Sequence, residues 1–378
     1  MDRNVRAGRV GRARPVGTGY AVTMRSHLRL KRRRSFLRPL ALLVAIAGLS
    51  ACGASGTTPA PSTTASMAMP TGSGGPAASA PAAVQGFGPG CGAASPPATL
   101  PAEWTHAPAT PKVIPEIVSS QLACGPTRVV FSFIDSDNRP IAAPDRTARV
   151  AFFDLGRDSS TPAFSGDGTF IWLIEGQTGI YVVNVEFPES GEWGALFTTA
   201  APGGPPEEVR LRFEVQPMSY TPVLGSTAPS VRTPTLADVG GDVRQISSDR
   251  TPDPRFYQLS EDQALAQHKP FVLVFATPAF CTSRVCGPTL DRVKAFAKAY
   301  PDLAFINVEP YRLTFAKGLL QPTLDANGQL QATDATNAWR ILSEPWIFVV
   351  DGAGIVRGTF ESVAADAELA AAIGAATK

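Results

Sequence analysis

The chain has few histidines and little charge. Three of its 378 residues are histidine and 17% are charged. His27 lies in a basic N-terminal stretch, His106 in a region of small residues, and His268 before an apolar run. None of them is well placed to activate a nucleophile. A mechanism built on a cysteine–histidine or serine–histidine pair is therefore not expected.

Basic residues are scarce after residue 38. Residues 1–38 hold twelve of the 34 Lys and Arg and a single acid, Asp2, which leaves 22 basic and 31 acidic residues in the remainder. Nucleic-acid binding needs clustered Lys and Arg that replace phosphate counterions. We therefore expect no nucleic-acid partner.

No apolar run near the N-terminus reaches the ~20 residues of a membrane-spanning helix. Residues 40–49 are apolar, follow a basic segment and precede Cys52, which is the order of a cleaved signal peptide. The sequence LSAC that ends at Cys52 resembles a bacterial lipobox, in which the cysteine sulfur receives a lipid. We expect residues 1–52 to be a signal peptide whose true start is Met24, and the mature protein to be lipid-anchored on the extracytoplasmic face of the cell membrane. Arg33-Arg34 leaves the export route open between the general and the twin-arginine pathway.

Charged residues are absent from residues 53–102, where Ala, Pro, Ser, Thr and Gly dominate. Such a composition cannot bury a core, so residues 53–112 are expected to be a disordered tether. The tether contains Cys91, and Cys124 follows it. In an exported protein we expect these two cysteines to be candidates for a structural disulfide.

Short runs with alternating apolar residues, separated by turn residues, fill residues 113–216. This pattern predicts an all-β sandwich. The stretch Gly179-Ile180-Tyr181 resembles the tyrosine corner of immunoglobulin-like domains, and residues 217–240 are interpreted as a linker. The expected strands are 128–134, 148–155, 169–174, 179–187, 192–199 and 208–215.

Strand and helix patterns alternate in residues 241–378, which predicts an α/β domain. Residues 271–276 form an apolar run suited to a strand covered on both faces. Cys281, Cys286 and Pro288 follow, on the way into a helix, and Pro345 opens a later apolar strand at 346–350.

This order resembles the thioredoxin superfamily over residues 258–376, about a third of the chain. The resemblance rests on the strand, Cys281, Pro288 and Pro345 together. It implies a thioredoxin-like fold with a cis peptide bond before Pro345, which would lie against the active-site sulfur. It also implies thiol–disulfide exchange with protein substrates and no cofactor.

The position of Cys281 supports a reactive thiol there even without the resemblance to thioredoxins. A cysteine at a helix N-terminus meets unpaired N–H groups and the positive end of the helix dipole, which stabilise its thiolate. Arg284 could add positive charge, and Cys286 would resolve the mixed disulfide.

Two features depart from the thioredoxin pattern. Residues five apart on a regular helix have Cα atoms roughly 8 to 9 Å apart, beyond the reach of a disulfide. Cys281 and Cys286 can therefore bridge only if residues 282–284 leave the helix. The buried carboxylate that many thioredoxins carry on the preceding strand would fall at Phe275, so an obvious proton relay is missing.

Three other functions are compared with the sequence. Sco-type copper chaperones need a later histidine, which this chain lacks after His268, so no metal is expected. Peroxiredoxins have a threonine three residues before the reactive cysteine. This chain has Pro278 there, and Thr277 is one residue out of register, which argues against peroxidase activity. The protein could also be a non-catalytic binding or assembly lipoprotein that uses the fold as a scaffold. Residues 312–335 are expected to be an insertion that either decorates the surface or shapes a partner groove.

Overall fold

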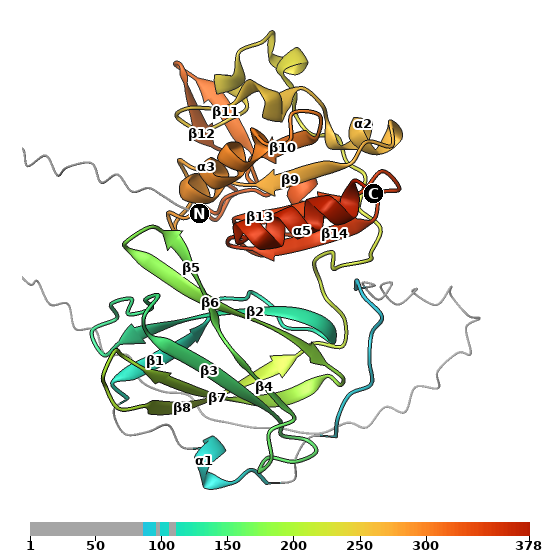
Figure 1. The fold of residues 1–378 in the computed structure, drawn as a ribbon. Coiled ribbons are helices and arrows are strands. Elements are labelled where there is room, and N and C mark those ends of the chain that lie inside the picture. Colours follow the sequence, from blue (N-terminus) through green and yellow to red (C-terminus); the bar gives the residue numbers. More distant parts are fainter. Residues whose placement is uncertain (1–85, 96–98, 106–110) are drawn as a thin grey trace, which may run out of the picture. The chain divides into compact units, whose positions relative to one another are not determined.

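A computed structural model describes residues 86–95, 99–105 and 111–378. The predicted signal peptide, Cys52, His106 and most of the tether lie outside the described residues. The described part is β-rich and multidomain (Figure 1). Among its helices, none combines the length and the apolar character needed to cross a membrane.

Residues 113–215 form two four-stranded antiparallel sheets, with strand orders β1-β2-β6-β5 and β4-β3-β7-β8. All six predicted strands are present. Sequence reasoning missed β1 and β4, which are edge strands; β1 contains Pro115, and β4 has only four residues. The bounds are β1 Val113–Ile117, β2 Gly125–Asp135, β3 Thr147–Asp154, β4 Phe164–Asp167, β5 Thr169–Ile174, β6 Thr178–Phe187, β7 Gly191–Ala200 and β8 Glu207–Val215.

The alternation predicted in β6 places one set of side chains in the core between the sheets. Tyr181, Val183 and Phe187 are buried in the same cluster as Phe131 of β2 and Trp193 of β7. The Tyr181 hydroxyl is satisfied by the backbone of Ala143, to which it donates at 2.8 Å. The aromatic side chains of both sheets therefore form one contiguous core.

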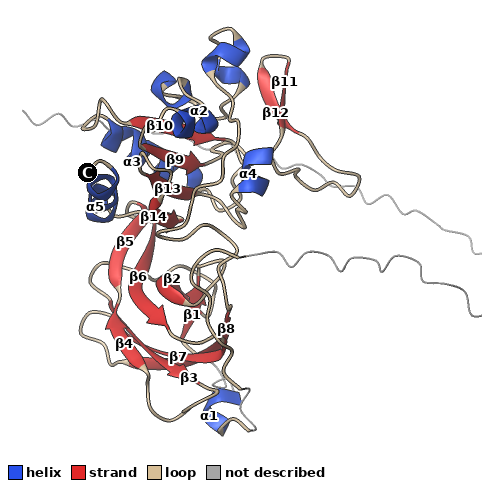
Figure 2. Ribbon diagram, turned by 90° about the vertical axis from the view of Figure 1, so that its right-hand side faces the viewer, coloured by secondary structure: helices blue, strands red, loops and turns tan. Residues whose placement is uncertain are grey.

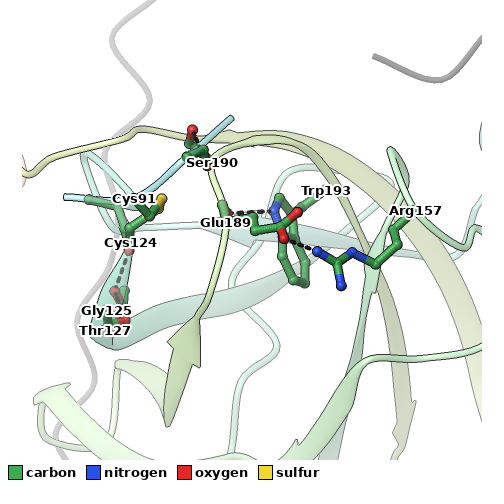
Figure 3. Close-up of a disulfide and its surroundings, with 10 residues drawn as sticks. Cys91, Cys124, Gly125, Thr127, Arg157, Glu189, Ser190 and Trp193 are labelled. Atoms are coloured by element: carbon green, nitrogen blue, oxygen red, sulfur yellow. Dashed lines mark hydrogen bonds and ion pairs between the residues drawn. A yellow bond between two sulfur atoms is a disulfide. The ribbon is translucent and has the colours of Figure 1, made fainter. Parts of the chain in front are cut away.

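The end of the predicted tether is folded, which corrects the expectation of disorder up to residue 112. Cys91 and Cys124 form the expected disulfide, with Cα atoms 6.1 Å apart (Figure 3). Phe87 pairs through its backbone with Ser219. The short helix α1 (Ala102–Thr105) buries Trp104. A disulfide and a few apolar side chains thus order a segment whose composition alone predicted disorder.

The predicted linker is also not free. Within residues 217–240, the N–H groups of Gly225 and Ala228 donate to the carbonyls of Val356 and Gly354 at 2.9 and 2.8 Å. Thr233 is fully buried and its N–H donates to Ser260 Oγ. Pro and Ser indicate an irregular backbone, but buried N–H groups still need partners, and the C-terminal region supplies them.

The C-terminal region contains a four-stranded mixed sheet in the order β10-β9-β13-β14. Strands β9 and β10 are parallel, whereas β13 is antiparallel to both β9 and β14. A separate hairpin, β11-β12, lies within the predicted insertion. The bounds are β9 Phe271–Phe275, β10 Ala304–Val308, β11 Leu313–Ala316, β12 Leu319–Pro322, β13 Trp346–Val350 and β14 Val356–Glu361.

Helices lie along this sheet (Figure 2). Apolar residues of α3 and α5 share a cluster with Val272, Val274 and Ile347, so these two helices cover one face. Residues of α2 and α4 cluster with Phe271 and Phe348 on the other face. The bounds are α2 Glu261–Ala266, α3 Cys286–Ala297, α4 Asp334–Ala338 and α5 Asp366–Ala376, with 3₁₀ turns at Leu236–Val239, Val243–Gln245 and Pro254–Tyr257.

Candidate functional site

A turn between the buried strand β9 and helix α3 presents the two free cysteines. The carbonyl of Thr277 accepts the N–H groups of Phe280 and Cys281 at 3.1 and 3.0 Å. Arg284, with a φ of 63°, adopts the left-handed conformation, and its N–H donates to the carbonyl of Cys281 at 3.3 Å. Helix α3 begins only at Cys286. Residues 282–284 therefore lie outside the helix, which is the condition for a bridge between the two cysteines.

The structure places the start of the helix after Cys281, later than the position of Cys281 at a helix N-terminus implied. Cys286, not Cys281, is the first residue of α3, and it is fully buried. Cys281 is half-buried and precedes the helix by a turn, with its sulfur close to the N–H groups of Val285 and Cys286. The helix N-terminus therefore still acts on the Cys281 sulfur, but from the neighbouring turn.

The two sulfurs have opposite protonation preferences. Hydrogen bonding from the Cys286 thiol has the largest effect on the pKa of Cys281. The hydroxyl of Ser283, whose Oγ lies 3.2 Å from Cys281 Sγ, adds to this effect, and the pKa of Cys281 is lowered to about 5. The same contact and burial raise the pKa of Cys286. Arg284 is exposed and is not among the leading influences on Cys281. These contacts therefore favour a thiolate at Cys281 and a thiol at Cys286.

The loop before β13 brings a carboxyl group to these sulfurs. The Glu344–Pro345 peptide bond is cis, as predicted, and Pro345 is buried. The two Sγ atoms and a carboxylate oxygen of Glu344 all lie within 4.8 Å of one another. Glu344 Oε2 accepts a hydrogen bond of 2.6 Å from the hydroxyl of Tyr311. The site therefore combines two thiols, a carboxyl and a phenol.

Burial is the main influence on the carboxyl of Glu344. It raises the pKa of Glu344. The hydrogen bond from Tyr311 lowers this pKa, and the negative charge of Cys281 raises it. Burial and Glu344 together raise the pKa of the Tyr311 phenol. No Lys or Arg is among the leading influences on either group.

Sequence reasoning missed Glu344, Tyr311 and Ser283. Glu344 could have been predicted, because it directly precedes Pro345, which the resemblance to thioredoxins places against the active-site sulfur. Tyr311 directly precedes the predicted insertion, so the pattern gave no reason to place it at the site. Its position depends on backbone pairing with Ala332 at the other end of that insertion.

Phe275 leaves no carboxyl on the strand before the cysteines. Its ring is fully buried against Trp339 and Phe348. His268 lies elsewhere, with Nδ1 3.2 Å from the carbonyl of Gly352.

Across the described ranges no other trio of His, Cys, Asp or Glu side chains comes as close together as Cys281, Cys286 and Glu344.

Comparison with known proteins gives no family for this chain. No protein-family model matches it, and no curated protein matches it. A solved structure, MtrC from Shewanella baltica OS185, aligns with 12% identity and a TM-score of 0.21, covering 41% of this chain and 29% of the MtrC chain. The alignment thus spans less than a third of MtrC, and a similarity this weak carries no argument about fold or function.

Proposed function

We propose that residues 241–378 are a thioredoxin-like α/β domain. The support is the arrangement of the parts: a buried strand β9 leads to a cysteine pair and helix α3, and a cis proline opens the adjacent strand β13. Helices on both faces of the mixed sheet fit the same architecture. An immunoglobulin-like sandwich over residues 113–216 is proposed on the same footing, from its two antiparallel sheets.

The function this site supports best is thiol–disulfide exchange with protein disulfides. The observation that carries it is the pairing of a half-exposed Cys281 with a buried Cys286 at the start of α3. The Cys281 thiolate attacks a substrate disulfide and releases one substrate thiolate, which takes a proton from water. Cys286 then attacks Cys281 Sγ and releases the second thiolate. Two electrons pass from the dithiol to the substrate, and Cys281 and Cys286 are left as a disulfide.

This division of roles predicts one-sided trapping. Cys286→Ser should accumulate a disulfide-linked adduct between Cys281 and the substrate, because the second attack is missing. Cys281→Ser should accumulate none. The measurement is a mass shift on a non-reducing gel that reductant removes.

Wild-type protein cycled under the same conditions is the control for thiol competence. Equal trapping by both variants would reject the assignment of roles. If the wild-type thiols cycle and neither variant forms an adduct, the scaffold function replaces the enzymatic one.

We also propose that the protein works outside the cytoplasm on a lipid anchor at Cys52. The Cys91–Cys124 disulfide supports an oxidising compartment, and the LSAC sequence supplies the anchor. Cys52→Ala should leave an unprocessed precursor that no longer incorporates a labelled fatty acid. Cys91→Ala is the matched control, since it also removes a cysteine but lies downstream of the processing site. Undiminished labelling of Cys52→Ala would refute the anchor.

A further inference from the structure

The proposed exchange requires a proton to leave Cys286, and its thiol holds that proton tightly. Cys286 is fully buried and donates to the Cys281 thiolate, and both effects raise its pKa. The preceding strand offers no base, because Phe275 occupies the position where a carboxyl could have stood. The step from mixed disulfide to product therefore needs an acceptor from another part of the fold.

Glu344 is the carboxyl that the structure places beside Cys286. Its oxygen lies within 4.8 Å of both sulfurs, a separation that a side-chain rotation or one bridging water spans. Its Oε2 is held by Tyr311 from the loop after β10. Tyr311 thus anchors one oxygen of the Glu344 carboxyl group, which lies close to the two sulfurs.

We infer that Glu344 is the general base that takes the proton of Cys286 when the mixed disulfide resolves, with Tyr311 as its positioning residue. The inference rests on the proposed exchange reaction. The proton moves from Cys286 Sγ to the Glu344 carboxylate, and the resulting thiolate forms a bond to Cys281 Sγ. The bond between Cys281 and the substrate sulfur breaks, and the departing thiolate receives a proton from Glu344 or from water.

The charges at the site favour this transfer only after the substrate has bound covalently. In the free enzyme the Cys281 thiolate raises the pKa of both Cys286 and Glu344. Formation of the mixed disulfide removes that negative charge, so both groups become easier to deprotonate. The carboxyl group of Glu344 then faces a thiol that has lost its hydrogen-bond acceptor, and the proton passes from that thiol to the ionised carboxyl group.

The groups that face Glu344 are all acids. They are Cys281 from the turn, Cys286 from α3 and Tyr311 from the β10 loop. The basic side chains nearest in sequence have other contacts: Arg312 donates to Asp334 at 2.6 Å, and the guanidinium of Arg340 lies 5.2 Å from the ring centre of Phe87. A pH profile of this step therefore reports on Glu344 and the thiols.

A symmetrical aromatic disulfide, dithiobis(nitrobenzoate), separates the two steps. Attack by Cys281 releases the first coloured thiolate, and attack by Cys286 releases the second. The coloured thiolate is a weak base and needs no proton to leave, so the second phase isolates deprotonation of Cys286. The full chain carries Cys52→Ser in every variant, which leaves Cys281 and Cys286 as its free thiols. A chelator removes trace metal.

Glu344→Gln should slow the second phase by about a hundredfold or more near neutral pH, the lower end of general-base catalysis, and should change the rate of the first phase far less. The wild-type second phase should rise with pH and level off above the pKa of Glu344. In Glu344→Gln it should rise about tenfold per pH unit throughout, because hydroxide replaces the carboxylate. Glu344→Asp should restore part of the plateau.

Tyr311→Phe tests the positioning role. The Tyr311 hydroxyl lowers the pKa of Glu344, so its loss should move the midpoint of the second phase upward by about one pH unit, as expected for a charge-assisted hydrogen bond. The matched control is Glu261→Gln. Glu261 is a fully buried carboxyl with a raised pKa, but its Oε2 accepts the N–H of Val231 and it has no contact with the sulfurs.

The outcomes separate this inference from the proposed function. If wild-type protein releases only the first thiolate, Cys286 does not resolve and the exchange function fails. If wild-type protein releases both while Glu344→Gln keeps the wild-type pH profile, the general base is elsewhere. Equal slowing of both phases in Glu344→Gln would assign Glu344 a structural role and overturn the inference.

Discussion

At about pH 6, Cys281 should still react with iodoacetamide at about nine-tenths of its maximal rate, whereas an ordinary thiol of pKa about 8.5 falls to roughly one three-hundredth of its own maximum. The expectation follows from a pKa lowered to about 5 in a half-buried residue. Rates are compared with each thiol's own plateau, because thiolates of lower pKa are intrinsically weaker nucleophiles. Mass spectrometry of the peptide that contains Cys281 measures the rate from about pH 4 to 9.

The cause of this shift can be tested residue by residue. Cys286→Ala removes the hydrogen bond that lowers the pKa of Cys281 most, so the midpoint of the alkylation profile should move up toward that of an ordinary thiol. Ser283→Ala removes a smaller influence and should move it less. Arg284→Ala should leave it nearly unchanged. A wild-type midpoint near that of a free cysteine would contradict the assignment of Cys281 as the nucleophile.

The elements of the C-terminal region were predictable because their sequence patterns are local. The apolar runs that became β9 and β13 are bounded by turn residues and buried throughout, as their composition indicates. The cis bond before Pro345 was expected from the resemblance to thioredoxins, which rests in part on that proline's place in front of a strand. Spacing also showed that Cys281 and Cys286 can meet only if the residues between them leave the helix.

What could not be predicted depends on contacts between distant segments. Tyr311 and Glu344 are 33 residues apart, and only the folded chain brings the phenol to the carboxyl. Residues 86–95 had the composition of a tether, yet the Cys91–Cys124 disulfide and backbone pairing order them. The disulfide itself was expected, but neither the partner of Glu344 nor the backbone partners of residues 86–95 leave a signal in the local sequence.

A second buried carboxyl should make the stability of the C-terminal region depend on pH. Glu309 follows β10 and is 8% exposed. Its Oε1 accepts the N–H of Ser248 at 2.6 Å, and its Oε2 has no hydrogen-bond partner within the described part of the chain. Burial raises the pKa of Glu309 to about 7, above the value of about 4.3 that glutamate has in an unfolded chain.

The sign of the effect follows from proton binding. Between about pH 4.3 and 7 the folded state holds a proton on Glu309 that the unfolded state has released, so stability falls as pH rises through this window. Glu309→Gln removes the titration while its amide oxygen can still accept from Ser248. The variant should lie within about 1 kcal/mol of wild type at about pH 4.5 and exceed its unfolding free energy by about 3 to 4 kcal/mol at about pH 8.

Because the protein is multidomain, the measurement should be local: hydrogen exchange of peptides from β9 and β10 at increasing urea, at several pH values.

Asp351→Asn provides a control at a carboxyl group whose pKa is shifted in the opposite direction, downward. Hydrogen bonds from Ile355, Ala353 and Arg357 lower the pKa of Asp351, so its stabilising contribution is present above about pH 4 and disappears only below that pH. Asp351→Asn should therefore destabilise by an amount that stays constant from about pH 5 to 8. If Glu309→Gln also differed from wild type by a constant amount over this range, the carboxyl of Glu309 would be ionised throughout it, and the pH dependence of stability would have to come from another group.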